Sequence, residues 1–299
     1  MSETLTTPDG RRLEFVTGGA EGGFPLLFHG GTPSAALAYE PLWQAARAAD
    51  LRLVTYSRPG YGASTPRPAA TEPVIADDVA DSVLLLDALG IDEFVTLGWS
   101  GGGPRALACA ALLPGRCRAA TSLAGVAPAD AVGLDWTAGM GPENVRDFEL
   151  AGQGREALRP TVEEQVAEFR KVTGDQIVAA FGGLVDEVDA AALTGEFGEY
   201  VAASFRHAAA QGAVGLLEDN LQVMRAWGFE PADIPVPVAV WQGAHDRMVP
   251  FAHGQWLAAR IPGARAHLFD DEGHISLVHR IDEMLAELRE LAGLPGRVG

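Results

Sequence analysis

Cysteine is scarce in this chain, which has only Cys109 and Cys117 among its 299 residues. Two cysteines are too few for a disulfide framework. Cys109 lies in the apolar run ALACAALL, where we expect a small core residue. A charged and then apolar leader is also missing, because the opening MSETLTTPDG is polar from its start. Together these features favour a reducing cytoplasm as the compartment.

Basic residues are few as well. The chain carries 22 Lys and Arg residues against 40 Asp and Glu residues, a formal net charge of −18 at pH 7. Nucleic acid and anionic membrane surfaces would repel such a chain, so we expect neither as a partner. Long apolar runs are absent, since none approaches the ~18 residues of a membrane span. The 47% of hydrophobic residues instead predicts a large buried core.

Short apolar and β-branched runs alternate with helical patterns in the first 127 residues. A Pro-Asp-Gly turn separates two predicted strands within residues 4–19. Further strands are predicted within residues 25–31, 51–62, 94–99 and 118–125, and helices at about 41–49, 74–90 and 104–113. Strands that alternate with helices at this spacing predict a mostly parallel sheet that is covered by helices on both faces.

The pattern changes near residue 128. Residues 128–232 show helical patterns such as TVEEQVAEFRKV and no convincing buried strand. Strand patterns return at residues 235–243 and 264–270, and an amphipathic helix follows them. We therefore predict an α/β core formed by residues 1–127 and 233–299, interrupted by a helical insertion over 128–232 that serves as a lid.

One serine stands between a predicted strand and a predicted helix in the stretch VTLGWSGGGPRALA. Gly98-Trp99-Ser100-Gly101-Gly102 fits the pattern G-x-S-x-G, in which the chain reverses from strand to helix within a few residues. The reversal strains the central residue and leaves no room for side chains two positions before and after it. It also lifts the Ser100 hydroxyl clear of the sheet and directs the Gly101 amide toward the same point. The pattern therefore predicts a nucleophilic serine.

A serine nucleophile needs a base to take its proton, and the base needs an orienting partner. Asp246 follows a predicted strand in PVPVAVWQGAHDRMVP, and His274 follows the last predicted strand in ARAHLFDDEGHISLV. The chain order Ser100, Asp246, His274 is one of the known orders of a catalytic triad. We expect neither His245, which precedes the acid directly, nor His29 to be the base.

With these motifs in place, the chain resembles the α/β-hydrolase superfamily from its first strands to its last helix. HGGTPSA, SRPGYGAS, GWSGGG, GAHDRMVP and DEGHISL match landmarks of that family in the same order. The resemblance implies an α/β-hydrolase fold: a mostly parallel eight-stranded sheet with helices on both faces and a helical cap after the sixth strand. It also implies Ser100 as nucleophile, His274 as base and then acid, and Asp246 as the carboxylate that orients the imidazole. Gly31 and Gly101 match the donors of the family's oxyanion hole.

The resemblance further implies a serine hydrolase without a cofactor that cleaves an ester of a small, moderately apolar molecule. An aminopeptidase is an alternative because HGGTP is close to the HGGPG loop of proline iminopeptidases, although Thr32 departs from that loop. C–C bond hydrolysis, lactone hydrolysis, acyl transfer and perhydrolysis use the same triad, and fold analogy does not choose among them. A binding protein that has lost turnover is the alternative outside the enzymes. The oligomeric state stays open.

The acidic run Asp270-Asp271-Glu272-Gly273-His274 has the composition of a metal-ligand cluster. Consecutive carboxylates rarely converge on one ion, and no second histidine is spaced to complete the set. We therefore expect a solvated loop there and no metal site.

Overall fold

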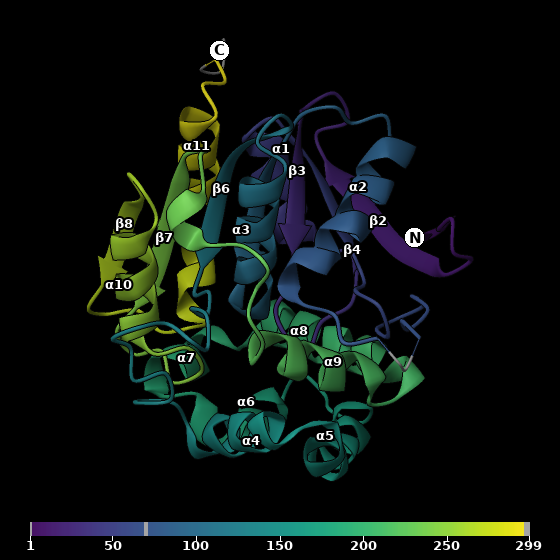
Figure 1. The fold of residues 1–299 in the computed structure, drawn as a ribbon, viewed down its shortest axis with the longest axis vertical. Coiled ribbons are helices and arrows are strands. Elements are labelled where there is room, and N and C mark those ends of the chain that lie inside the picture. The colour runs from purple at the N-terminus through teal and green to yellow at the C-terminus, as the bar shows by residue number, and fades with distance from the viewer. Residues whose placement is uncertain (1, 69–70, 296–299) are drawn as a thin grey trace.

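Eight strands join one sheet in the computed structural model, which describes residues 2–68 and 71–295 (Figure 1). Along the sheet they follow the order β1-β2-β4-β3-β5-β6-β7-β8. The strands are β1 (Glu3–Thr6), β2 (Arg12–Gly19), β3 (Phe24–His29), β4 (Leu51–Tyr56), β5 (Phe94–Trp99), β6 (Cys117–Leu123), β7 (Val238–Gly243) and β8 (Arg265–Phe269). The pairings of β2 with β1 and β4 are antiparallel, and all others are parallel. The predicted mostly parallel eight-stranded sheet is confirmed.

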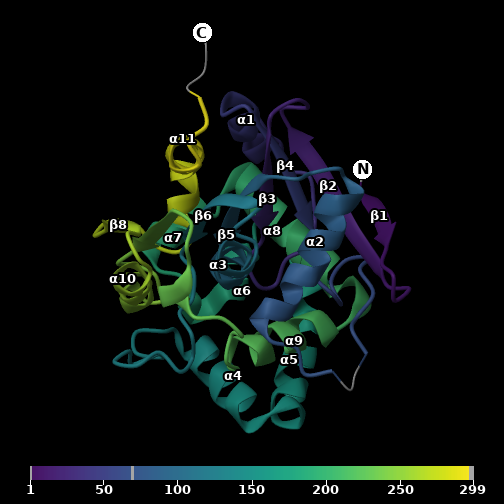
Figure 2. The same cartoon turned by 45° about the horizontal axis from the view of Figure 1, so that its top comes forward.

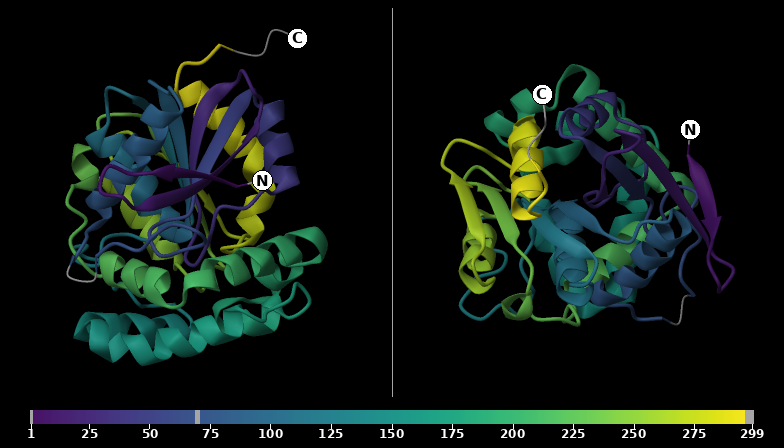
Figure 3. Two further views of the ribbon diagram at one scale, coloured as in Figure 1. Left: turned by 90° about the vertical axis from the view of Figure 1, so that its right-hand side faces the viewer. Right: turned by 90° about the horizontal axis from the view of Figure 1, so that it is seen from above.

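Helices cover both faces of this sheet (Figure 2; Figure 3, right). One face carries α1 (Glu40–Ala48) and α11 (Ile281–Leu291), and the other carries α2 (Asp78–Ala88), α3 (Gly103–Leu112) and α10 (Phe251–Arg260). Central strands between two helical layers are buried on both sides, which explains their near-continuous apolar sequences. β7, for example, is buried at all of its positions.

The helix α10 has the sequence FAHGQWLAAR. A glycine inside a helix weakens the helical pattern, and Gly254 stands in the middle of this one. The structure supplies the reason for the glycine: a Cβ atom at Gly254 would collide with the side chain of Gln242 on β7. The glycine therefore lets α10 approach the sheet closely at this strand.

The chain between β6 and β7 forms helices at the carboxyl ends of the parallel strands (Figure 1; Figure 3, left). These helices are α4 (Pro142–Gln153), α5 (Arg155–Phe169), α6 (Ile177–Phe181), α7 (Glu187–Ala192), α8 (Gly195–Ala208) and α9 (Val214–Val223). They lie in two tiers, with α8 and α9 next to the sheet and α4 and α5 farther from it (Figure 3, left). Within the described residues, no helix is both long and apolar enough to cross a membrane.

Candidate active site

Ser100 lies on a sharp turn between β5 and α3. Its φ angle is +56°, a left-handed conformation that costs energy for any residue with a Cβ atom. A Cβ atom at Gly98 would collide with the carbonyl oxygen of Gly102, and one at Gly102 would collide with the carbonyl oxygen of His29. The predicted crowding two positions before and after the serine is therefore confirmed.

Asp246 follows β7 and is held by donors on both of its carboxylate oxygens. Oδ1 accepts hydrogen bonds from the backbone amides of Met248 at 2.8 Å and Val249 at 2.7 Å. Oδ2 accepts a hydrogen bond from Nε2 of Gln242 at 2.8 Å. The Asp246 residue is 4% exposed, so these bonds fix its orientation away from competing water.

His274 lies in the loop after β8 and pairs with this carboxylate. Its Nδ1 atom is 2.7 Å from Oδ2 of Asp246, and an ionised carboxylate only accepts, so Nδ1 carries the proton. Burial alone would lower the pKa of His274, but the charge and hydrogen bond of Asp246, together with the charge of Asp189, raise it. The backbone carbonyl of His274 also accepts a hydrogen bond from Nε1 of Trp99 at 3.3 Å.

Ser100 and His274 line one cavity of about 60 Å³. In the described part of the chain, no hydrogen bond joins the side chains of Ser100 and His274. Such bonds are often long in enzymes without substrate and tighten when substrate binds. Ser100 also lines a larger cavity of about 780 Å³ that extends among the helices between β6 and β7. The small cavity has room for a reacting carbonyl group, and the larger one for the rest of a small molecule.

Gly31 and Gly101, the predicted oxyanion donors, both lie close to Ser100: Gly101 follows it in the chain, and Gly31 packs against it from the loop after β3. A Cβ atom at Gly31 would lie 3.4 Å from the Cβ atom of Ser100, and one at Gly101 would collide with the hydroxyl of Thr32. The loop after β3 thus packs directly against the first turn of the serine segment. At Gly101 the approach requires a residue without a side chain, whereas a Cβ atom at Gly31 would make an ordinary van der Waals contact.

Four charged residues of the site were not predicted from the sequence. Asp189 on α7 is buried, and its carboxylate accepts hydrogen bonds from the backbone amides of His274 and the two residues after it. Asp219 on α9, Arg58 after β4 and Arg105 on α3 form a second buried cluster against the loops that carry Gly31 and Gly101. Arg105 had a sequence signal, since it is a lone charge in an apolar helix. The two aspartates had none, because they resemble exposed positions of amphipathic helices.

Two other histidines near the site, His29 and His245, have surroundings that differ from those of His274. His29 is buried, and burial with the nearby charges of Arg58 and Arg105 lowers the pKa of its imidazole to about 3. His245 is exposed and pairs with Oδ2 of Asp186 at 2.8 Å through its Nδ1 atom. Among the described residues, no group of three or more His, Cys, Asp or Glu side chains is arranged to hold a metal ion.

The fold and the site define a class of protein. A mostly parallel eight-stranded sheet with a serine on a strained turn after β5 and an Asp–His pair after β7 and β8 is the arrangement of an α/β hydrolase.

Comparison with known proteins leads to the same class. The family model of the alpha/beta hydrolase fold matches residues 25–280, so the chain belongs to this family and is a hydrolase. It is 29% identical over 235 residues to pimeloyl-[acyl-carrier protein] methyl ester esterase of Aromatoleum aromaticum, a match that covers 76% of this chain and 81% of that protein. An alpha/beta hydrolase fold protein from Nakamurella multipartita is 26% identical, with a TM-score of 0.69 and coverage of 98% and 100%. A hydrolase from Pseudomonas aeruginosa PA01 is 24% identical, with a TM-score of 0.67 and 98% coverage of both chains.

Proposed function

We propose that this protein is a serine hydrolase that cleaves an ester of a small, moderately apolar molecule through an acyl-enzyme intermediate. The observation that carries the proposal is the 2.7 Å hydrogen bond between Asp246 and His274. His274 also lines the same cavity as Ser100, whose backbone is strained. The similar esterase of Aromatoleum aromaticum, whose name specifies a methyl ester, supports ester cleavage.

The proposed reaction uses groups of the chain alone. Ser100 Oγ attacks the ester carbonyl while Nε2 of His274 takes the hydroxyl proton, and Asp246 stabilises the imidazolium that results. The amides of Gly31 and Gly101 donate to the oxyanion. The C–O bond to the leaving alcohol then breaks as His274 returns the proton to it. Water attacks the acyl-enzyme in the same way, which frees the acid and restores Ser100.

The cavity walls support an apolar substrate. Phe181 on α6 with Tyr200 and Phe205 on α8 line the cavity that holds Ser100 and His274, and Met248 and Ile275 are among the other apolar residues of its wall. These aromatic residues come from the insertion, so we propose that residues 128–232 act as a cap that selects the substrate.

A panel of substrates tests the proposal. We expect p-nitrophenyl esters of short and medium acyl chains to turn over and amino-acid anilides not to, because the cavity at Ser100 is small and mostly apolar. Release of p-nitrophenol and p-nitroaniline from matched concentrations measures the two activities. Preference for anilides would instead support the aminopeptidase alternative, and no turnover of any ester would contradict the proposal.

The pH dependence of the rate tests the role of His274. A base must be neutral to accept a proton. Burial lowers the pKa of His274, but Asp246 and Asp189 raise it more, so that the pKa lies above the ordinary value of 6.5. We therefore expect kcat/KM to fall as pH drops through a value above 6.5. The profile is measured between about pH 5 and pH 9, with a fluorescence check that the protein stays folded. A rate that stays constant across the acid side would exclude His274 as the base.

A further inference from the structure

Two arginines are buried beneath the candidate oxyanion hole, and each holds one of its loops. Arg58 is 4% exposed, and its Nη1 and Nη2 atoms donate to the carbonyl oxygens of Gly30 and Gly31, both at 2.7 Å. Arg105 is 1% exposed, and its Nη1 atom donates to the carbonyl oxygen of Gly101 at 2.7 Å. Both loops that carry the predicted oxyanion donors are thus fixed by a guanidinium group from below.

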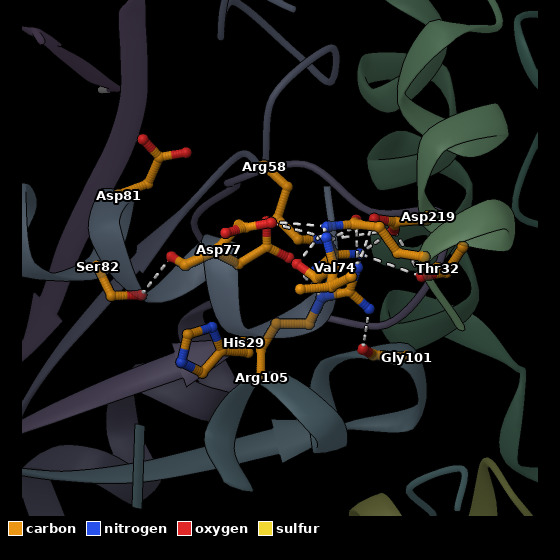
Figure 4. A network of polar contacts seen from close by, with 12 residues as sticks. His29, Thr32, Arg58, Val74, Asp77, Asp81, Ser82, Gly101, Arg105 and Asp219 are labelled. Carbon is orange, nitrogen blue, oxygen red and sulfur yellow. Dashed lines mark hydrogen bonds and ion pairs between the residues drawn. The ribbon is translucent and has the colours of Figure 1, made fainter. Parts of the chain in front are cut away.

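One carboxylate from the insertion joins the two arginines (Figure 4). Oδ2 of Asp219 accepts a hydrogen bond from Nη2 of Arg58 at 2.6 Å, and Oδ1 accepts one from Nη2 of Arg105 at 2.9 Å. The hydroxyls of Thr32 and Tyr61 donate to the same carboxylate at 2.7 and 3.0 Å. Asp219 is 2% exposed and lies on α9. It therefore ties the loop after β3 to the serine segment.

Planarity of the peptide group connects Arg58 to the oxyanion donor. The carbonyl of Gly30 and the amide of Gly31 belong to one peptide unit, whose C=O and N–H bonds point in opposite directions. A guanidinium bound to the Gly30 oxygen fixes this plane and turns the Gly31 amide away from Arg58. It also polarises the unit, which makes the amide a stronger donor.

Stability alone is a poor reason for this cluster. Burying arginines and a carboxylate costs desolvation, and apolar side chains of similar size would fill the space without that cost. Apolar side chains, however, have no donors for the carbonyl oxygens of Gly30, Gly31 and Gly101. The charged cluster supplies those donors in fixed directions, as the forked shape of the guanidinium allows.

We propose that Asp219 is a positioning residue for the oxyanion hole, which acts through Arg58 and Arg105 to fix the Gly31 and Gly101 amides relative to each other. This inference rests on the proposed serine-hydrolase function. One consequence is that the oxyanion hole is complete only while α9 is packed against the core. The cap thereby contributes to the chemical step as well as to substrate selection.

Two substitutions test the positioning role. Asp219→Asn places an amide NH₂ group against one of the two arginines, so the carboxylate no longer joins them. Arg58→Lys keeps the positive charge beside Asp219, but an ammonium group lacks the fork that reaches two carbonyl oxygens at once. The lysine variant also retains the buried ion pair, and it therefore provides the test if Asp219→Asn does not fold.

Each substitution has a matched control in the same part of the molecule. Glu14→Gln removes the negative charge from another contact between core and cap, since the buried Glu14 carboxylate lies 3.0 Å from Nε2 of His207 on α8. Arg67→Lys changes an arginine of the same charged network that pairs with Asp78 and Asp81. Within the described structure, neither control side chain has a hydrogen bond to the backbone of residues 30–32 or of Gly101.

The measurements separate positioning from stability. Turnover of a short p-nitrophenyl ester gives kcat and KM, and a fluorophosphonate gives the rate at which Ser100 is phosphonylated with loss of fluoride. We expect Asp219→Asn and Arg58→Lys to lower kcat and the phosphonylation rate by about 10- to 100-fold. KM should change by less than about threefold, because the ground-state ester makes little use of the oxyanion donors. The controls should keep both rates within about threefold of wild type even where urea denaturation shows lower stability.

Other outcomes would overturn the inference. If the wild-type protein is labelled at Ser100 while both test variants react as fast as their controls, the positioning role fails and the proposed function stands. The positioning role also fails, with the proposed function intact, if the test variants raise KM and leave kcat unchanged. If wild-type Ser100 is not labelled at all, the proposed function fails and the positioning role fails with it.

Discussion

Replacement of Ser100 by alanine is expected to lower kcat for ester hydrolysis by about 10⁴-fold or more. The substitution removes the oxygen that is proposed to form the acyl-enzyme, while Asp246, His274 and the proposed oxyanion donors stay in place. Residual turnover would then come from direct attack of water on an ester carbonyl that the oxyanion donors polarise. Steady-state rates with a short p-nitrophenyl ester measure the loss, and a fluorophosphonate should label the wild-type protein once per chain and leave the variant unlabelled.

Ser122→Ala is the matched control for this experiment. Ser122 is buried on β6, the neighbour of the strand that leads to Ser100, and its hydroxyl has no hydrogen-bond partner within the described part of the chain. Its loss should leave the rate within about twofold of wild type. Activity of Ser100→Ala at the level of this control would exclude Ser100 as the nucleophile.

The sheet was predictable from the sequence because each strand is a local pattern. Runs such as FVTLGW and PVPVAVWQG read as buried strands on their own, and their alternation with helices defines a parallel sheet. The strained turn at Ser100 was predictable for the same reason, since the glycines that relieve its crowding lie within two residues of it. The glycine inside α10 had no such local explanation, because Gly254 serves a contact with the distant β7.

The two buried aspartates of the site were not predictable, because their partners lie far away in the chain. Asp219 binds Arg58, 161 residues before it, and Asp189 binds the backbone of His274, 85 residues after it. In sequence, either aspartate is one more acidic position on a helix of an acidic protein. Their burial depends on how the insertion packs on the core, and only the three-dimensional structure contains that information.

Asp246→Asn is expected to lower kcat by about 10⁴-fold while the fold stays intact. The amide oxygen takes the place of Oδ1, which accepts from the backbone amides of Met248 and Val249. The NH₂ group must then face His274, where the carboxylate accepted from Nδ1. Two donors cannot face each other, so the imidazole proton moves to Nε2. With Nε2 protonated, the ring has no lone pair left to take the proton of Ser100.

The tautomer itself is the decisive measurement, because a merely destabilised protein would not change it. Nitrogen-15 chemical shifts of His274 should place the proton on Nδ1 in the wild-type protein and on Nε2 in Asp246→Asn. Asp186→Asn is the control, since Asp186 also pairs with a histidine, the exposed His245, outside the cavity. That variant should retain wild-type kcat within about twofold. If Asp246→Asn keeps both the wild-type rate and the wild-type tautomer, Asp246 does not orient the base, and the base must be held in place by the backbone contacts from Asp189.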